Sequence, residues 1–300
     1  RNMNTPTRID VLKTSDSILR HLKKIREHGA PYRGRVHSVY RHTINLQFPD
    51  GLLALQCADS PLSPISLTLP LNGSQMDALS VTQSAPCFIY PDHIEIHCKD
   101  SLILIHVEQT ADHYSASISD VTIGSTFRDC IGKVIQESGK SGFAYIFNDD
   151  PHLKGDFILL GARKYIQETE EFLNNEEPEK AAISFGRILG LGTGLTPSGD
   201  DFLCGVLAML RTTGQEKNPF TRMLSRRIQQ NLFATNDISG EFLQSALRGE
   251  YSEPAIHLLQ AADRGIGEIT GYAKSFLHIG HSSGIDTLCG MLWVLDNFAR

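Results

Sequence analysis

Residues 190–205 form the most unusual run of the chain, GLGTGLTPSGDDFLCG, in which five glycines precede or open a predicted helix. Within it, Thr196 and Pro197 make a natural N-cap and first helical residue. A glycine-rich approach to a helix start presents free backbone N–H groups and the positive end of the helix dipole, which suit a phosphate or a carboxylate. We therefore interpret the run as an anion site. The alternative is a sharp turn whose glycines only permit tight packing.

A second run, GHSSGIDTLCGML at residues 280–292, repeats part of the first at a distance of 85 residues. The shared pattern is S-G-x-D-x-L-C-G-x-L. It pairs Ser198 with Ser283, Gly199 with Gly284, and Asp201 with Asp286. Two turns of one design within one helical region predict two helix N-termini that converge on one ligand. Chance similarity between two glycine-containing helices is the alternative.

Two familiar glycine motifs do not fit the first run. Gly194 and Gly199 have the spacing of a P-loop, but Asp200 and Asp201 follow where nucleotide phosphates need Lys and then Ser or Thr. The glycines of residues 190–194 also miss the dinucleotide fingerprint, because the third is misplaced and a predicted helix, not a strand, leads into the loop.

The second run matches the nucleophile elbow G-x-S-x-G of α/β hydrolases at residues 280–284. That fold needs an acid and then a histidine after the serine, and no histidine follows His281. We therefore take Ser282 and Ser283 as N-cap and anion-ligand hydroxyls.

Three polar side chains alternate along one predicted strand. His93, Glu95 and His97 would share one face, which is compatible with a divalent metal. A solvated strand face is the commoner use of such a pattern, and we predict no metal site.

The elements around these runs predict an α+β fold in three parts. We expect an N-terminal helix within residues 1–30, a β-rich, barrel- or sandwich-like domain of antiparallel strands over 31–120, and a mainly helical domain over 121–300 that carries both glycine-rich turns. The predicted strands lie within 36–48, 51–58, 65–71, 87–98 and 101–108. The predicted helices are 15–27, 126–137, 164–174, 177–189, 197–212, 221–232, 240–248, 253–262, 266–276 and 283–299.

Composition limits the partners of the chain. Its 300 residues carry a net charge of -6, so no global cationic field attracts nucleic acid or an anionic membrane. The six cysteines contain no C-x-x-C pair, which favours reduced thiols over disulfides or a thiolate zinc site. No apolar targeting segment is visible at the start, and we expect a cytoplasmic protein.

The two glycine-rich runs, together with TNDISGEFLQSALRGEYSEPAIHLL at 235–259, resemble the AllH-like family. The resemblance covers residues 190–292, whereas the β-rich half matches in length and general character alone. Thr193 and Cys204 depart from the usual residues of the family, Pro and a small residue such as Ala, and neither change removes a polar ligand.

The resemblance implies a subunit of oxamate carbamoyltransferase. That complex interconverts oxalurate plus phosphate with oxamate plus carbamoyl phosphate during allantoin, and hence purine, catabolism. The implied partners are the other subunits of the complex and small anions, namely carbamoyl phosphate, oxamate and phosphate, and no cofactor is required. Two other functions stay open: a non-catalytic assembly subunit, and a carboxylase-linked protein that binds an anion.

Carbamoyl transfer would need positioning, stabilisation of an oxyanion and a base. We expect Asp200 or Asp201 to act as the base or as a metal-bound carboxylate, with His281 as the acid or oxyanion donor. Capping of a helix N-terminus is the alternative role of both acids. The predicted anion and substrate ligands are Gly192, Gly194, Thr196, Ser198, Gly199, Ser282, Ser283, Gly284 and Asp286.

Overall fold

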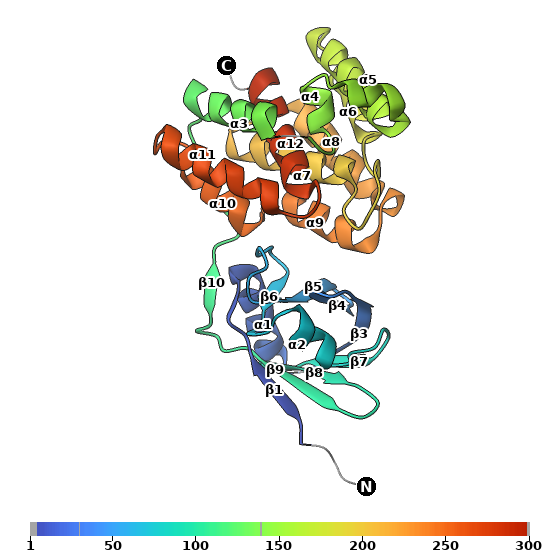
Figure 1. The fold of residues 1–300 in the computed structure, drawn as a ribbon, viewed down its shortest axis with the longest axis vertical. Coiled ribbons are helices and arrows are strands. Elements are labelled where there is room, and N and C mark those ends of the chain that lie inside the picture. Colours follow the sequence, from blue (N-terminus) through green and yellow to red (C-terminus); the bar gives the residue numbers. More distant parts are fainter. Residues whose placement is uncertain (1–4, 30, 139, 299–300) are drawn as a thin grey trace. The chain divides into compact units, whose positions relative to one another are not determined.

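The computed structural model describes residues 5–29, 31–138 and 140–298, which fall into two compact units (Figure 1). Unit 1 comprises residues 1–116 and unit 2 comprises residues 117–300. Unit 1 is a curled mixed sheet and unit 2 is mainly helical, which confirms the predicted α+β fold class. Among the described residues, no helix has both the length and the apolar character that crossing a membrane requires.

The described part of unit 1 contains one ten-stranded sheet with the strand order β1-β9-β8-β7-β3-β4-β5-β6-β2-β10. The strands are β1 (Thr7–Asp10), β2 (Lys13–Ser15), β3 (Tyr32–Val39), β4 (Thr43–Phe48), β5 (Gly51–Gln56), β6 (Ser66–Thr68), β7 (Pro86–Ile89), β8 (His93–His97), β9 (Leu102–His106) and β10 (Asp112–Tyr114). The expectation of antiparallel strands throughout is wrong, because β1 with β9, β5 with β6, and β10 with β2 pair in parallel.

Two helices complete the core of unit 1. Helix α1 (Asp16–His28) buries one apolar face, which includes Leu22 and Ile25, in the same cluster as the inward residues of the sheet. The short helix α2 (Gly73–Ala78) adds Met76 to that cluster and begins with a capping box. Period-3.6 spacing in α1 and alternation in the strands therefore bury their apolar residues in one core.

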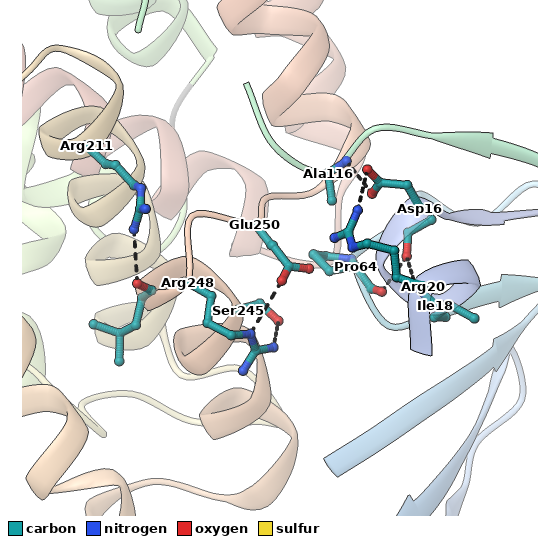
Figure 2. A network of polar contacts seen from close by, with 11 residues as sticks. Asp16, Ile18, Arg20, Pro64, Ala116, Arg211, Ser245, Arg248 and Glu250 are labelled. Carbon is teal, nitrogen blue, oxygen red and sulfur yellow. Dashed lines mark hydrogen bonds and ion pairs between the residues drawn. The ribbon is translucent and has the colours of Figure 1, made fainter. Parts of the chain in front are cut away.

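The start of α1 fastens several distant segments of unit 1 (Figure 2). The Ser15 hydroxyl accepts the N–H of Ile18 at 3.1 Å and donates to the Pro64 carbonyl at 2.6 Å. The Asp16 carboxylate accepts the N–H of Ala116 at 3.0 Å. The last residue of unit 1 is thus held against its first helix.

Unit 2 is built around two helices, α7 (Ser198–Thr212) and α12 (Ser283–Asn297), most of whose residues are buried. The surrounding α-helices are α3 (Ser125–Ser138), α4 (Ala144–Phe147), α5 (Phe157–Asn174), α6 (Pro178–Gly186), α8 (Pro219–Gln230), α9 (Asp237–Leu247), α10 (Glu253–Gln260) and α11 (Ile266–Ser275). Short 3-10 helices are η1 (Pro151–Gly155), η2 (Leu232–Ala234) and η3 (Phe276–His278). The buried ring of Phe185 packs at a tilt against those of Phe202 and Trp293.

The far end of α9 is fixed by a residue of α7. Arg211 donates to the Leu247 carbonyl at 3.3 Å, and Figure 2 shows this bond beside the pair formed by Arg248 and Glu250. Gly249 follows with a φ of 79°, and a Cβ there would lie 2.6 Å from the Arg211 side chain. Helix α9 is therefore held firmly against α7.

Candidate functional site

The two glycine-rich turns lead into α7 and α12. Where these two helices cross, their backbones are in close contact. A Cβ on Gly205 would lie 2.1 Å from the Thr287 carbonyl oxygen, and a Cβ on Gly290 would lie 2.0 Å from the Phe202 carbonyl oxygen. The two contacts are equivalent in the 85-residue repeat. Gly205 corresponds to Gly290, and Phe202 corresponds to Thr287. The repeated glycine of the L-C-G pattern therefore marks the crossing point of two quasi-equivalent helices.

The other repeated glycine lets each helix start pack on the preceding turn. Gly199 donates its N–H to the Leu191 carbonyl at 2.8 Å, and Gly284 donates its N–H to the Ile279 carbonyl at 3.1 Å. A Cβ would lie 2.2 Å from the Ile188 carbonyl oxygen at Gly199 and 1.8 Å from that of Phe276 at Gly284. Both N–H groups bond within the turns, and the two glycines permit the close packing of each helix start.

Hydroxyl groups join the two helix starts. The Thr196 and Ser283 hydroxyls share a hydrogen bond of 2.7 Å, and the Ser198 and Ser282 hydroxyls share one of 3.3 Å. All four residues are half-buried. The predicted convergence of the two turns is thus present as a layer of four hydroxyls.

Of the predicted N-cap residues, Ser282 takes the N-cap position and Thr196 does not. Thr196 is not the N-cap of α7, because Pro197 takes that position with extended geometry and contributes no side-chain cap. Ser282 is the N-cap of α12, but its hydroxyl makes no capping bond. The Thr196 hydroxyl bonds to that of Ser283, and the Ser282 hydroxyl bonds to that of Ser198.

Two carboxylates lie buried at these helix starts. Asp201 in α7 is 9% exposed and Asp286 in α12 is fully buried, and each has an Oδ2 atom with no hydrogen-bond partner among the described residues. Burial raises the pKa of Asp286 to about 7, against the opposing effects of the Phe143 N–H and of two serine hydroxyls. Burial, and then the charge of Asp286, raise the pKa of Asp201 well above its usual range. The two acids therefore interact, and they hold a proton into the neutral range.

A loop before α4 positions one of these acids. Phe143 donates its backbone N–H to Asp286 Oδ1 at 2.7 Å. The preceding Gly142 has a φ of 50°, and a Cβ there would lie 2.2 Å from the same oxygen. The sequence analysis did not predict a role for this loop. Gly142 was the residue that could have indicated a tight turn there.

Asp200 belongs to a separate network. Its Oδ1 accepts the Gly190 N–H at 2.7 Å, and its Oδ2 accepts the Ser239 hydroxyl at 2.6 Å together with the Thr235 hydroxyl. Both oxygens are engaged, which fits an acid that fastens the glycine-rich loop to the start of α9. The Asn236 side chain extends this attachment by donating to the Leu195 carbonyl at 2.8 Å.

The remaining predicted ligands lie outside the buried group. His281 is exposed and makes no hydrogen bond or ion pair within the described ranges. Gly192, with a φ of 127°, packs so closely that a Cβ would lie 2.7 Å from the Ser198 nitrogen. Gly194, with a φ of 86°, is exposed and has no neighbour within 4 Å of a built Cβ.

The polar residues of strand β8 form a hydrogen-bonded network in unit 1. The Glu95 carboxylate lies 3.2 Å from His93 Nε2 and 2.8 Å from His97 Nε2, so its oxygens bridge the two rings. Over the parts of the chain that the structure describes, no group of three or more His, Cys, Asp or Glu side chains is arranged to hold a metal ion.

The fold and the site define an α+β protein whose helical unit buries two acids beneath hydroxyls at two quasi-equivalent helix starts. A family profile described as oxamate carbamoyltransferase subunit AllH matches residues 188–295, which include α7 and all but the last two residues of α12. A second, described as the AllH family N-terminal domain, matches residues 10–111 and so lies within unit 1. Together they cover more than half of the chain, and the chain belongs to the AllH family. No solved structure matches it significantly.

Proposed function

We propose that this chain is a subunit of an oxamate carbamoyltransferase-like complex and that it supplies part of the active site. The observation that supports this most is the pair of buried acids, Asp201 and Asp286, beneath hydroxyls at two helix N-termini. The family to which the chain belongs is named after that enzyme. The complex would work in the cytoplasm, within allantoin catabolism, with the other subunits as partners.

The reaction requires one proton transfer and one displacement. The amide nitrogen of oxamate forms a bond to the carbamoyl carbon, the bond from that carbon to the phosphate oxygen breaks, and the nitrogen loses a proton. The reverse reaction consumes oxalurate and phosphate. A carboxylate whose pKa lies near the working pH is well suited to accept that proton, and Asp286 has this property.

The hydroxyls and helix starts supply the complementary charge. Thr196, Ser198, Ser282 and Ser283 can donate to an oxyanion or a phosphate, and the positive ends of the α7 and α12 dipoles add to this field. In this proposal Asp201 and Asp286 act as the acid–base pair. The exposed His281 would take part only if a bound substrate or a partner subunit contacted it. Asp200 would have a structural role.

One experiment separates catalysis from assembly. Phosphate-dependent cleavage of oxalurate is measured for the complex with this chain, without it, and with Asp201→Asn or Asp286→Asn in its place. A catalytic role predicts that each variant assembles normally and loses at least about a hundredfold in turnover, the usual minimum for removal of a general base. Full turnover without the chain would exclude the catalytic role.

Ligand binding gives an independent test. Phosphate, carbamoyl phosphate or oxamate at 100 times its dissociation constant should stabilise the chain by about 2.7 kcal/mol, which a thermal shift detects. If none of these anions shifts the melting temperature of either the chain or the complex, the proposed substrate site is wrong.

A non-catalytic assembly role has one specific observation in its favour. The side chains of Phe233 in η2 and Phe157 at the start of α5 are 84% and 87% exposed, as expected of residues that a partner subunit covers. This alternative predicts normal turnover for both aspartate variants and loss of the complex when Phe233 or Phe157 is changed to Ser. A carboxylase-linked anion-binding role has no such support.

A further inference from the structure

The two buried acids have unused hydrogen-bonding capacity. Asp286 uses Oδ1 to accept the Phe143 N–H, whereas Oδ2 of Asp286 and Oδ2 of Asp201 accept nothing among the described residues. Buried carboxylate oxygens are normally hydrogen-bonded. Two such atoms on quasi-equivalent helix turns indicate a group that is absent from the free chain.

The chemistry of that group follows from the polarity of its surroundings. The hydroxyls of Thr196, Ser198, Ser282 and Ser283 can donate as well as accept, and they are half-buried, whereas the carboxylates beneath them are buried more deeply. An anion can interact favourably with the hydroxyl layer, but an ionised carboxylate would repel it. Once Asp286 is ionised, and with the proton of Asp201 on its Oδ1, both Oδ2 atoms are acceptors. In that state the part of a ligand that reaches the acids must donate hydrogen bonds.

We propose that the unpaired Oδ2 atoms of Asp201 and Asp286 accept the two N–H groups of one –NH2 on a primary amide or carbamoyl ligand. The hydroxyls then donate to its carbonyl or carboxylate oxygens. Two free acceptors match the two donors of a single –NH2, whereas an ether, a carboxylate or a phosphate offers none. This inference rests on the proposed function, of which it names the substrate group that the acid pair recognises.

The inference has a sharp consequence for specificity. Oxamate and oxalate differ in one position, where the first carries –NH2 and the second carries an oxygen with negative charge. A site with two carboxylate acceptors should reject oxalate strongly, because a site built to hydrogen-bond an N–H leaves its acceptors unpaired when the N–H is missing. An anion site without such acceptors would bind oxalate at least as well as oxamate.

The experiment is isothermal titration calorimetry of oxamate and oxalate with the full chain, alone and in its complex. We expect wild-type protein to bind oxamate at least about a hundredfold more tightly than oxalate. Asp201→Asn and Asp286→Asn should each reduce that ratio at least tenfold, because an asparagine amide can donate to oxalate. The matched control is Asp296→Asn on α12, whose carboxylate pairs with Arg128 at 2.7 Å instead, and it should leave the ratio unchanged.

Three results would overturn the inference. Equal affinity of wild-type protein for the two ligands would do so, and this comparison does not depend on whether a variant folds. An oxamate-to-oxalate affinity ratio that stays unchanged in both Asp201→Asn and Asp286→Asn would also overturn it. So would saturable binding of MgCl2 that both substitutions abolish, because the acids would then form a cation site.

The inference and the proposed function can fail separately. If the complex without this chain cleaves oxalurate at full rate while the oxamate-to-oxalate ratio still depends on both acids, the amide site stands and the catalytic role is lost. If turnover needs the chain but the oxamate-to-oxalate ratio does not depend on the acids, the amide site is excluded and the chain is still required for the reaction.

Discussion

Gly205 and Gly290 occupy the same place on opposite helices, and each lies against a backbone carbonyl of the other helix. The oxygens they face belong to Thr287 and Phe202, so the contact is reciprocal. This crossing sets the separation of the two helix starts, and with it the positions of Asp201 and Asp286.

Alanine at either crossing glycine should destabilise unit 2. The new methyl group of Gly205→Ala or Gly290→Ala would meet a carbonyl oxygen near 2 Å, and overpacking of this kind costs about 1–3 kcal/mol or more. Gly161→Ala in α5 is the matched control, because nothing lies within 4 Å of its built Cβ, and it should stabilise by about 0.5–1 kcal/mol. Chemical denaturation measures all three, and equal effects would contradict the close crossing.

Asp200→Ala should destabilise the protein by about 3 kcal/mol or more, because it leaves the Gly190 N–H and two hydroxyls without their acceptor. Ser239→Ala removes one donor and should cost about 1–2 kcal/mol. Denaturant midpoints give both values. A variant that keeps full stability but loses turnover would show that Asp200 is catalytic.

Asp286 should make stability fall as pH rises. Its pKa is about 7 in the folded chain and 3.8 as the ordinary value, so between these values the folded state holds a proton that the unfolded state has lost. Stability attributable to this group is therefore fully present below about pH 4 and declines up to about pH 7. The raised pKa of Asp201 acts in the same direction.

The test is Asp286→Asn, which keeps an oxygen for the Phe143 N–H and has no charge to bury. It should match wild type near pH 4 and exceed it above pH 7 by up to a few kcal/mol, at about 1.4 kcal/mol per unit of pKa shift. Asp296→Asn should show no such gain. Identical pH dependence in wild type and Asp286→Asn would mean that the carboxyl is not buried as described.

Turnover of the complex should show the opposite trend. If the ionised form of Asp286 accepts the proton, the rate should rise with pH through about 7. Asp286→Asn should remove this rising limb as well as most of the rate. A limb that persists in the variant would assign the titration to another group.

The sequence predicted the helical part of the site because its signals are local. Glycines, serines and an acid repeated at 85 residues identify two similar helix starts, and their meeting follows from the close crossing at Gly205 and Gly290. The bonds from the Phe143 N–H to Asp286 and from the Ser239 hydroxyl to Asp200 were not predicted, because donors far away in the sequence leave no pattern near the acid they bind.

The sheet shows the same limit. Strands β3 to β9 overlap the five predicted runs, of which 36–48 and 87–98 each cover two strands, whereas β1, β2 and β10 were not predicted. These three strands take part in two parallel pairings, β1 with β9 and β10 with β2. Each of these pairings joins segments that are far apart in the sequence. The strand identities were therefore more predictable than their directions.

The Phe143 N–H distinguishes the two halves of the helix pair, since it holds Asp286 while Asp201 receives no backbone donor from that loop. In a site formed by two identical subunits around an exact twofold axis, the two carboxylates would be equivalent. An unsymmetrical small molecule could then bind there in either of two opposite orientations. Two similar helix starts within one polypeptide avoid this ambiguity, because the residues around each start can differ. If the proposed site binds a molecule only a few atoms long, this difference between the two halves would favour a single orientation of that molecule.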